Sequence, residues 1–126
     1  MNQITFPDFT KVDMRVGTII HAEVFHEAKI PAYKVTIDFG ELGLKKTSAQ
    51  ITKLYQPDDL IGKQVVAIVN FPPKQIANFM SECLILGAVG EENLISLLSP
   101  NHKMINGLKS KSYPLTVTNI VWLIQL

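Results

Sequence analysis

Cysteine is almost absent from this chain, and so is any sign of a secretory leader. Cys83 is the only cysteine among 126 residues, so no disulfide can form within one chain. The stretch from Met1 to Phe9 has neither a basic start nor an apolar run. Both absences predict a reduced protein that works in the cytoplasm.

An excess of one charge and a long apolar run are also missing. The net charge is only +1, too small to indicate a dedicated DNA-binding protein, although a local patch can still bind phosphate. The apolar C-terminal stretch, residues 113–126, contains Asn119 and is 14 residues long, whereas a helix that spans a bilayer needs about 20. We therefore expect neither DNA binding nor membrane insertion.

The residues that catalysis or metal binding requires are few and scattered. His21, His26 and His102 have no histidine partner at four-residue spacing and no cluster of carboxylates beside them. Cys83 opens an apolar stretch, which is typical of a small core residue and not of a nucleophile. A glycine-rich phosphate loop is also missing. We expect no catalytic activity, no cofactor and no metal site.

What the sequence does contain is a two-residue period of apolar side chains, typical of β-strands. In the stretch from Met14 to Val24 the even-numbered residues are expected to face the core, and between Tyr33 and Phe39 the odd-numbered ones. The predicted strands cover residues 14–24, 33–39, 45–49, 64–70 and 83–89, with residues 94–98 extending or closing the sheet.

One helical turn is predicted after the third strand. Ile51, Leu54 and Tyr55 have helical spacing, and Pro57 would end the turn. Five short strands with one short helix after the third predict an all-β fold, a five-stranded Greek-key OB-fold barrel with the helix over one end. The 126 residues are enough for one such domain and one core.

The connection between the fourth and fifth strands, NFPPKQIANFMSECLILG, is unusually long. Pro72 and Pro73 cannot donate to a strand ladder, so the chain is expected to leave the sheet at Phe71 and run extended until Cys83. This course places the intervening side chains on a stiff rim beside the face where OB-folds bind their ligands.

Three segments, VDMRVGTI, KKTSAQI and NFPPKQIANFMSECLILG, together resemble the tRNA-binding domain family, most closely the small CsaA-type export chaperones. The resemblance runs from Phe9 to Gly107. It implies an OB-fold homodimer without catalytic activity that binds tRNA and, in the CsaA branch, acts as a chaperone for exported preproteins. It also implies that residues 70–87 carry the RNA contacts.

Two hypotheses about the ligand follow, and the residues leave both open. The partner is tRNA in the first hypothesis, and an unfolded preprotein or the export machinery in the second. The residues expected to bind RNA are Lys45, Lys46, Ser48, Asn70, Lys74 and Ser81. Those expected to bind peptide are Phe71, Phe79 and Met80.

The connection departs from the family pattern in its charge. Gln75, Asn78 and Met80 stand where the family commonly has Arg, Lys or Gly. Asn78 can adopt the left-handed backbone conformation that a glycine would take, so the turn is expected to survive. The missing cations should weaken RNA binding and reduce its salt dependence, and a variant of the second hypothesis is a peptide-binding module that has lost RNA binding.

Asp13 and Arg15 lie two apart on one strand face and are expected to form a structural ion pair. Gly17, within the same strand, suggests a bulge or a sharp bend.

The chain divides into a binding domain, residues 1–108, and a C-terminal apolar extension, residues 109–126. The extension contains a run of apolar residues, 120–124, whose exposure would favour aggregation. We therefore expect it to pack as an extra strand or short helix against the barrel or its dimer mate.

Overall fold

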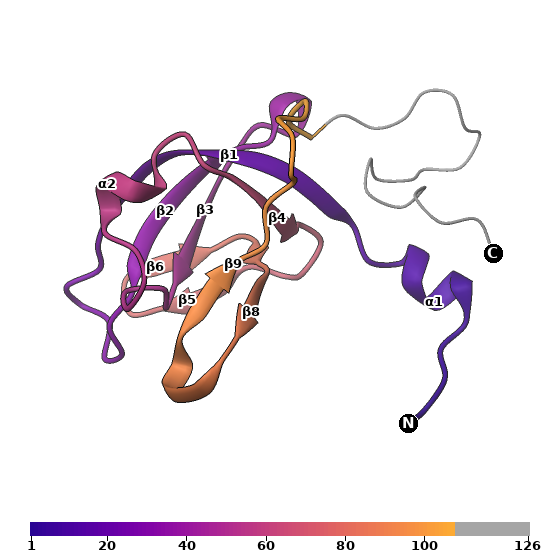
Figure 1. Ribbon diagram of the computed structural model, residues 1–126, viewed down its shortest axis with the longest axis horizontal. Coiled ribbons are helices and arrows are strands. Elements are labelled where there is room, and N and C mark those ends of the chain that lie inside the picture. Colours follow the sequence, from indigo (N-terminus) through magenta and orange to yellow (C-terminus); the bar gives the residue numbers. More distant parts are fainter. Residues whose placement is uncertain (108–126) are drawn as a thin grey trace.

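The computed structural model describes residues 1–107 and shows an all-β protein built around a five-stranded antiparallel sheet (Figure 1). The sheet has the order β3-β2-β1-β4-β7 and curls into a nearly closed barrel, so the predicted OB-type fold is confirmed. Its strands are β1 (Met14–Val24), β2 (Tyr33–Asp38), β3 (Leu44–Ala49), β4 (Gln64–Ile68) and β7 (Leu84–Ile85).

Two hairpins and four short helical segments complete the described part of the chain. One hairpin pairs β5 (Lys74–Ile76) with β6 (Phe79–Ser81), and the other pairs β8 (Gly87–Val89) with β9 (Ile95–Leu97). The helical segments are α1 (Phe6–Thr10), α2 (Pro57–Leu60) and the 3₁₀ turns η1 (Gly40–Leu42) and η2 (Glu91–Asn93). In Figure 1, α1 stands apart from the barrel.

The barrel closes between β3 and the residues just before β7. Glu82 donates its backbone N–H to the carbonyl oxygen of Lys46 at 2.7 Å, and its carboxylate accepts from the Lys46 N–H at 2.9 Å. The buried hydroxyl of Thr47 donates to the Cys83 carbonyl oxygen at 2.7 Å. These three hydrogen bonds, two of which involve side chains, thus complete a closure that strand pairing alone leaves open.

Strand β2 confirms the predicted alternation. Tyr33, Val35, Ile37 and, just beyond the strand, Phe39 are buried, and the residues between them are not. They form the core together with fully buried side chains from the neighbouring elements, Ile19, Leu60 and Val65.

For β1, the prediction of the inward face holds at Val16, which is buried, but is wrong at Ile20 and Val24. Ile19 is fully buried, whereas Ile20 and Val24 are 45% and 47% exposed. A register shift between Ile19 and His21 against β2 interrupts the two-residue period, so a single alternation cannot describe the whole strand. The bulge lies here and not at Gly17. Glycine is needed at position 17 because a Cβ there would clash with the side chains of Ile37 and Phe39.

The helix after β3 exists but begins where it was predicted to end. Residues 52–54 form a turn, and Pro57 is the first residue of α2. Proline suits this position because the first helical N–H has no partner within the helix. The carboxylate of Asp59 accepts from the backbone N–H of Gln56 at 2.8 Å and caps the turn, and Leu60 packs into the core.

The connection after β4 leaves the sheet as Pro72 and Pro73 predict, but it then forms the β5–β6 hairpin, which the sequence analysis did not foresee. The left-handed residue of its turn is Ala77, with φ of +52°, and not Asn78 as expected. An alanine in this conformation is strained, and the pairing of Ile76 with Phe79 holds it there.

The expected ion pair between Asp13 and Arg15 is confirmed. The Arg15 guanidinium donates to both carboxylate oxygens of Asp13, at 2.8 and 3.0 Å, and also to the carbonyl oxygen of Gly107 at 3.0 Å. Arg15 is only 3% exposed, so these three bonds satisfy a charge that would otherwise be costly to bury. The predictions for residues 109–126 lie outside the described residues.

Candidate functional site

The β5–β6 hairpin lies against β3, and these two neighbouring elements carry four of the predicted RNA-binding residues, Lys46 and Ser48 on β3 and Lys74 and Ser81 on the hairpin. The Ser81 hydroxyl is 2.8 Å from the Thr47 hydroxyl and accepts from the Ser48 backbone N–H at 3.3 Å. Lys74 is the register partner of Ser81. We call the surface formed by Lys46, Ser48, Lys74 and Ser81 the hairpin face.

The two lysines of the hairpin face are available for a ligand. Lys46 and Lys74 are exposed, and neither forms an ion pair with any of residues 1–107. By contrast, Lys34 of β2 is 3.5 Å from the Glu27 carboxylate. The hairpin face therefore carries two unneutralised positive charges beside hydroxyl groups, which is chemistry suited to phosphate.

Lys45 belongs to a different surface from Lys46, because successive strand residues point to opposite faces. It is half-buried, and its charge acts on the thiol of Cys83. The pKa of Cys83 is raised to about 12, mainly by burial; the charge of Lys45 and a hydrogen bond from Thr47 oppose this rise, and the charge of Glu82 adds to it. The thiol is therefore protonated at neutral pH, as expected for a core residue and not for a nucleophile.

Asn70 was predicted to contact RNA, but its side chain already has two partners. Its amide oxygen accepts from the Asp13 backbone N–H at 3.0 Å, and its amide nitrogen donates to the Lys11 carbonyl oxygen at 2.6 Å. These bonds fasten the end of β4 to the segment that precedes β1. This geometry favours a structural role for Asn70.

The three residues expected to bind peptide have different surroundings. Phe79 is half-buried and packs edge-on against the buried Phe25, with ring centroids 5.5 Å apart. The ammonium of Lys34 lies 4.9 and 5.6 Å from the centroids of Phe25 and Phe79. Phe71 and Met80 are 54% and 49% exposed. Phe79 thus holds the hairpin to the barrel, while Phe71 and Met80 are open to a ligand.

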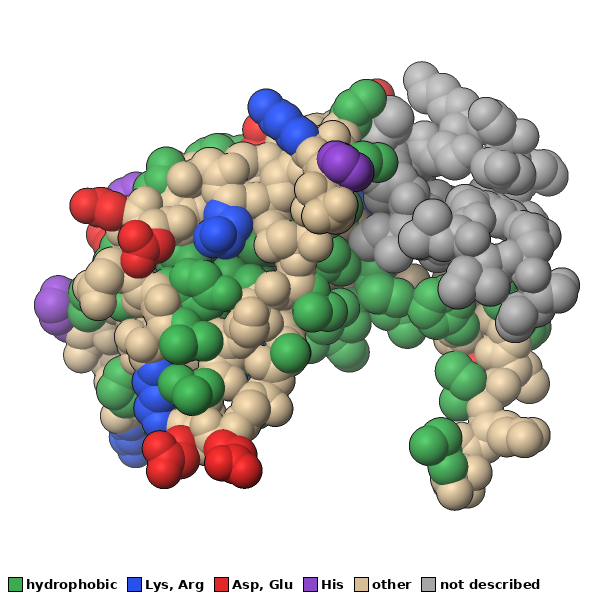
Figure 2. Space-filling model, in the orientation of Figure 1, with side chains coloured by type: hydrophobic (Ala, Val, Ile, Leu, Met, Phe, Trp, Pro, Cys, Tyr) green, Lys and Arg blue, Asp and Glu red, His purple; other side chains and the backbone are tan. Residues whose placement is uncertain are grey.

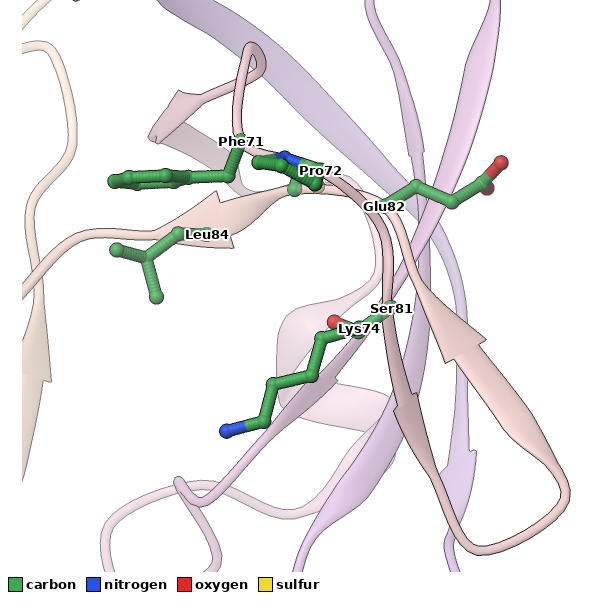
Figure 3. Close-up of a pocket in the computed structure, with 7 residues that line it drawn as sticks. Phe71, Pro72, Lys74, Ser81, Glu82 and Leu84 are labelled. Atoms are coloured by element: carbon green, nitrogen blue, oxygen red, sulfur yellow. The ribbon is translucent and has the colours of Figure 1, made fainter.

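Phe71 is at the edge of a pocket of about 380 Å³, the Phe71 pocket. In Figure 3 the side chains of Phe71 and Leu84 lie next to each other, and the Glu82 carboxylate points away from them. Leu84 is 48% exposed, and sequence analysis missed it because it reads as one more apolar residue of a strand. The pocket is lined by Phe71, Pro72, Lys74, Ser81, Glu82, Cys83 and Leu84.

Residues 1–107 contain no group of three or more His, Cys, Asp or Glu side chains that could hold a metal ion. None of the helices in this part of the chain has the length and hydropathy of a membrane span. What the described surface offers is basic and apolar binding chemistry.

Solved structures and curated relatives agree with this geometry. The chaperone CsaA from Bacillus anthracis is 55% identical, with a TM-score of 0.82 over 86% of this chain and 99% of that one. A CsaA chaperone from Picrophilus torridus is 50% identical, with a TM-score of 0.79 over 86% of this chain and 99% of that one. The methionine–tRNA ligase of Methanococcoides burtonii is 35% identical over 97 residues, 77% of this chain but only 14% of the ligase.

The family model described as a putative tRNA binding domain matches residues 14–109, which is most of the chain and includes the whole barrel and the hairpin face. This protein belongs to the tRNA-binding domain family.

Proposed function

We propose that this protein is a non-catalytic binding protein that holds tRNA on its hairpin face. The observation that carries the proposal is the pair of exposed ammonium groups of Lys46 and Lys74, both without an ion pair among residues 1–107, beside Ser48 and Ser81. Membership of the tRNA-binding domain family supports it. We do not extend the ligase activity of the relatives to this chain, which matches about one seventh of their length.

Binding would be mainly electrostatic. Each lysine that neutralises a phosphate releases condensed counterions, and the Ser48 hydroxyl would donate to a phosphate oxygen. Neutral side chains at Gln75, Asn78 and Met80 keep the number of such contacts small. We therefore expect modest affinity and a shallow salt dependence.

The test is a titration with tRNA at two salt concentrations. The double variant Lys46→Gln/Lys74→Gln should reduce the slope of log K against log salt by about two contacts. A matched control, Lys11→Gln/Lys53→Gln, removes the same charge from lysines that bind other groups, namely the Asp8 carboxylate and the Glu92 carbonyl oxygen. If both double variants bind tRNA equally, the hairpin face is not the site.

A second candidate function, binding of unfolded polypeptide, is favoured by the Phe71 pocket. Its walls are mostly apolar, and Phe71 and Leu84 expose about half of their surface. Exposed apolar side chains in a pocket suit an extended, partly unfolded chain. The two similar CsaA structures are described as chaperones, and on this proposal the ligand would be an unfolded preprotein or a component of the export machinery.

The two functions can be separated by measuring how variants of the Phe71 pocket bind each of the two ligands. Phe71→Ser should weaken binding of an unfolded polypeptide and leave tRNA affinity unchanged, because it removes no charge. Ile61→Ser is the matched control, since Ile61 is 48% exposed but lies after α2, away from the pocket. Equal polypeptide binding by both variants would rule out the Phe71 pocket as a chaperone site.

We also propose that the protein is a homodimer. The support is α1, which has no buried residue, and the apolar residues near it: Ile4 and Phe6 are 71% and 56% exposed. Association of two copies would remove such side chains from water. Light scattering at micromolar protein should give twice 14.1 kDa; a single-chain mass would contradict the proposal.

As a protein that binds tRNA or preproteins, it would work in the cytoplasm, where tRNA and newly made preproteins are present. Residues 1–108 would be the binding domain.

A further inference from the structure

A glutamine on β4 ties the end of the described chain to the barrel. The Gln64 amide nitrogen donates to the carbonyl oxygen of Met104 at 2.7 Å, and its amide oxygen accepts from the Met104 N–H at 2.8 Å. Forty residues apart in sequence, these two become neighbours in space. The residues that precede them, Lys63 and Lys103, are therefore brought to the same edge of the barrel.

The segment between β9 and Met104 is held at both of its ends. Leu98 donates to the Leu86 carbonyl oxygen at 3.1 Å and accepts from the Val66 N–H at 3.2 Å. The Gln64–Met104 pair fixes the other end. Residues 99–103 are thus a short loop whose backbone is fastened to the barrel at both ends.

This loop and residues 62–64 line a pocket of about 340 Å³ that contains no carboxylate. We call it the β4-end pocket. Lys63, His102 and Lys103 are among the lining residues, and none of them has an ion pair within residues 1–107; the ammonium of Lys63 lies 5.9 Å from the centroid of the Tyr55 ring. Figure 2 shows Lys or Arg and His side chains next to each other over the segment that follows β9.

The pocket stands out because the protein as a whole has a net charge of only +1. Acidic side chains are concentrated elsewhere: in Figure 2 they gather at the tip of the β8–β9 hairpin, and Asp58 and Asp59 of α2 do not line the pocket. A phosphodiester carries one negative charge and only accepts hydrogen bonds. The β4-end pocket supplies donors and positive charge without a competing acid.

We propose that the β4-end pocket binds phosphate groups of the RNA backbone and extends the tRNA footprint beyond the hairpin face. The inference rests on the proposed tRNA binding and adds a second, separate site to it. Two basic sites on one small barrel would position a large, folded RNA more firmly than one, because each additional phosphate contact adds to the electrostatic free energy of binding. The pocket is open and shallow, which suits a phosphate on a polymer.

The experiment compares tRNA binding by four forms of the full-length protein at two salt concentrations. These are the wild type, Lys63→Gln/Lys103→Gln, Lys46→Gln/Lys74→Gln and the charge-matched control Lys11→Gln/Lys53→Gln. The β4-end double variant should bind tRNA about tenfold more weakly than the control, with a salt slope reduced by about two contacts. Thermal unfolding of each form checks that the fold is unchanged.

The possible outcomes separate this inference from the proposed function. If the wild type does not bind tRNA, the proposed function fails. If the wild type binds, the hairpin variant binds more weakly and the β4-end variant equals the control, only the present inference is overturned.

A second arm distinguishes RNA from a free anion. Inorganic phosphate and tripolyphosphate are titrated while the ring resonances of His102 are followed by NMR. Weak binding of these anions, together with the loss of tRNA affinity in the β4-end variant, is the expected result. Tight binding of a free anion with no effect of the variant on tRNA would show that the pocket serves a small anion and would overturn the RNA assignment.

Discussion

The segment after β4 has two sides that differ sharply in their chemistry. On the inner side, the side chains of Asn70, Ser81 and Phe79 already contact other parts of the protein. On the outer side, Lys74 and Phe71 are exposed. Residue type does not separate the sides, since each has a polar and an aromatic member. The contacts that the barrel makes with each side chain decide which residues hold the segment and which can bind a ligand.

The strongest test of the inner side is Phe79→Ala. Removing the ring leaves a gap against Phe25 and Lys34, and we expect the free energy of unfolding to fall by about 2 to 3 kcal/mol, less than for a fully buried phenylalanine. Denaturant unfolding measures it. Phe71→Ala is the matched outer-side control and should cost far less; equal losses would erase the difference between the sides.

A second test uses the pH dependence of stability. The thiol of Cys83 has a folded-state pKa of about 12, above its ordinary value of 9.0. Between these values the unfolded chain has lost the proton while the folded chain keeps it, so stability should fall as pH rises, by at most about 1.4 kcal/mol per pH unit. Cys83→Ala should remove this part of the slope. An unchanged slope would mean that the thiol is more accessible than its burial suggests.

Asn70→Ala should have a smaller effect on stability. It removes two hydrogen bonds to the backbone of Lys11 and Asp13, at an exposed position where water can replace them, so we expect a loss of about 1 kcal/mol. Affinity for tRNA should hardly change. A large loss of tRNA affinity without a loss of stability would instead return Asn70 to the RNA-binding residues.

Lys74→Ala should have no measurable effect on unfolding, because the side chain is exposed and forms no ion pair with any of residues 1–107. The substitution should change only the binding of the ligand. We expect tRNA binding to weaken about fivefold and the salt slope to fall by about one contact. Unchanged affinity and slope would move the phosphate contacts away from the hairpin face.

Much of the fold could be predicted from the sequence. The alternation from Tyr33 to Phe39 is regular because the extra residue in the pairing of β1 with β2 lies in β1, so β2 itself carries no bulge. In β1 the same reasoning failed at Ile20, because a register shift is a property of the pairing with β2 and leaves no clear mark in the residues. Pro57 was expected to end the helix and instead begins it, because a proline is accepted at the first helical position, where its missing N–H has no partner to lose.

The candidate site was predicted less completely. The family segments pointed to residues 70–87, and the hairpin that carries Lys74 and Ser81 does lie against the strand that carries Lys46 and Ser48. Nothing in the sequence showed that Phe79 would pack against the barrel while Phe71 stayed exposed, or that the amide of Asn70 would be engaged in hydrogen bonds. The sequence could not show that Lys63 and Lys103 lie close together, because their proximity depends on the two hydrogen bonds between Gln64 and Met104.

The sequence by itself determined the fold class, the family and the point where the chain leaves the sheet after β4, because these depend on local periodicity, on motifs that lie in order along the chain and on prolines that cannot join a ladder. Only the tertiary structure decided which side chains of that segment remain free. A side chain's availability depends on whether a partner from a distant part of the chain comes within bonding distance, and that distance is fixed only when the barrel closes.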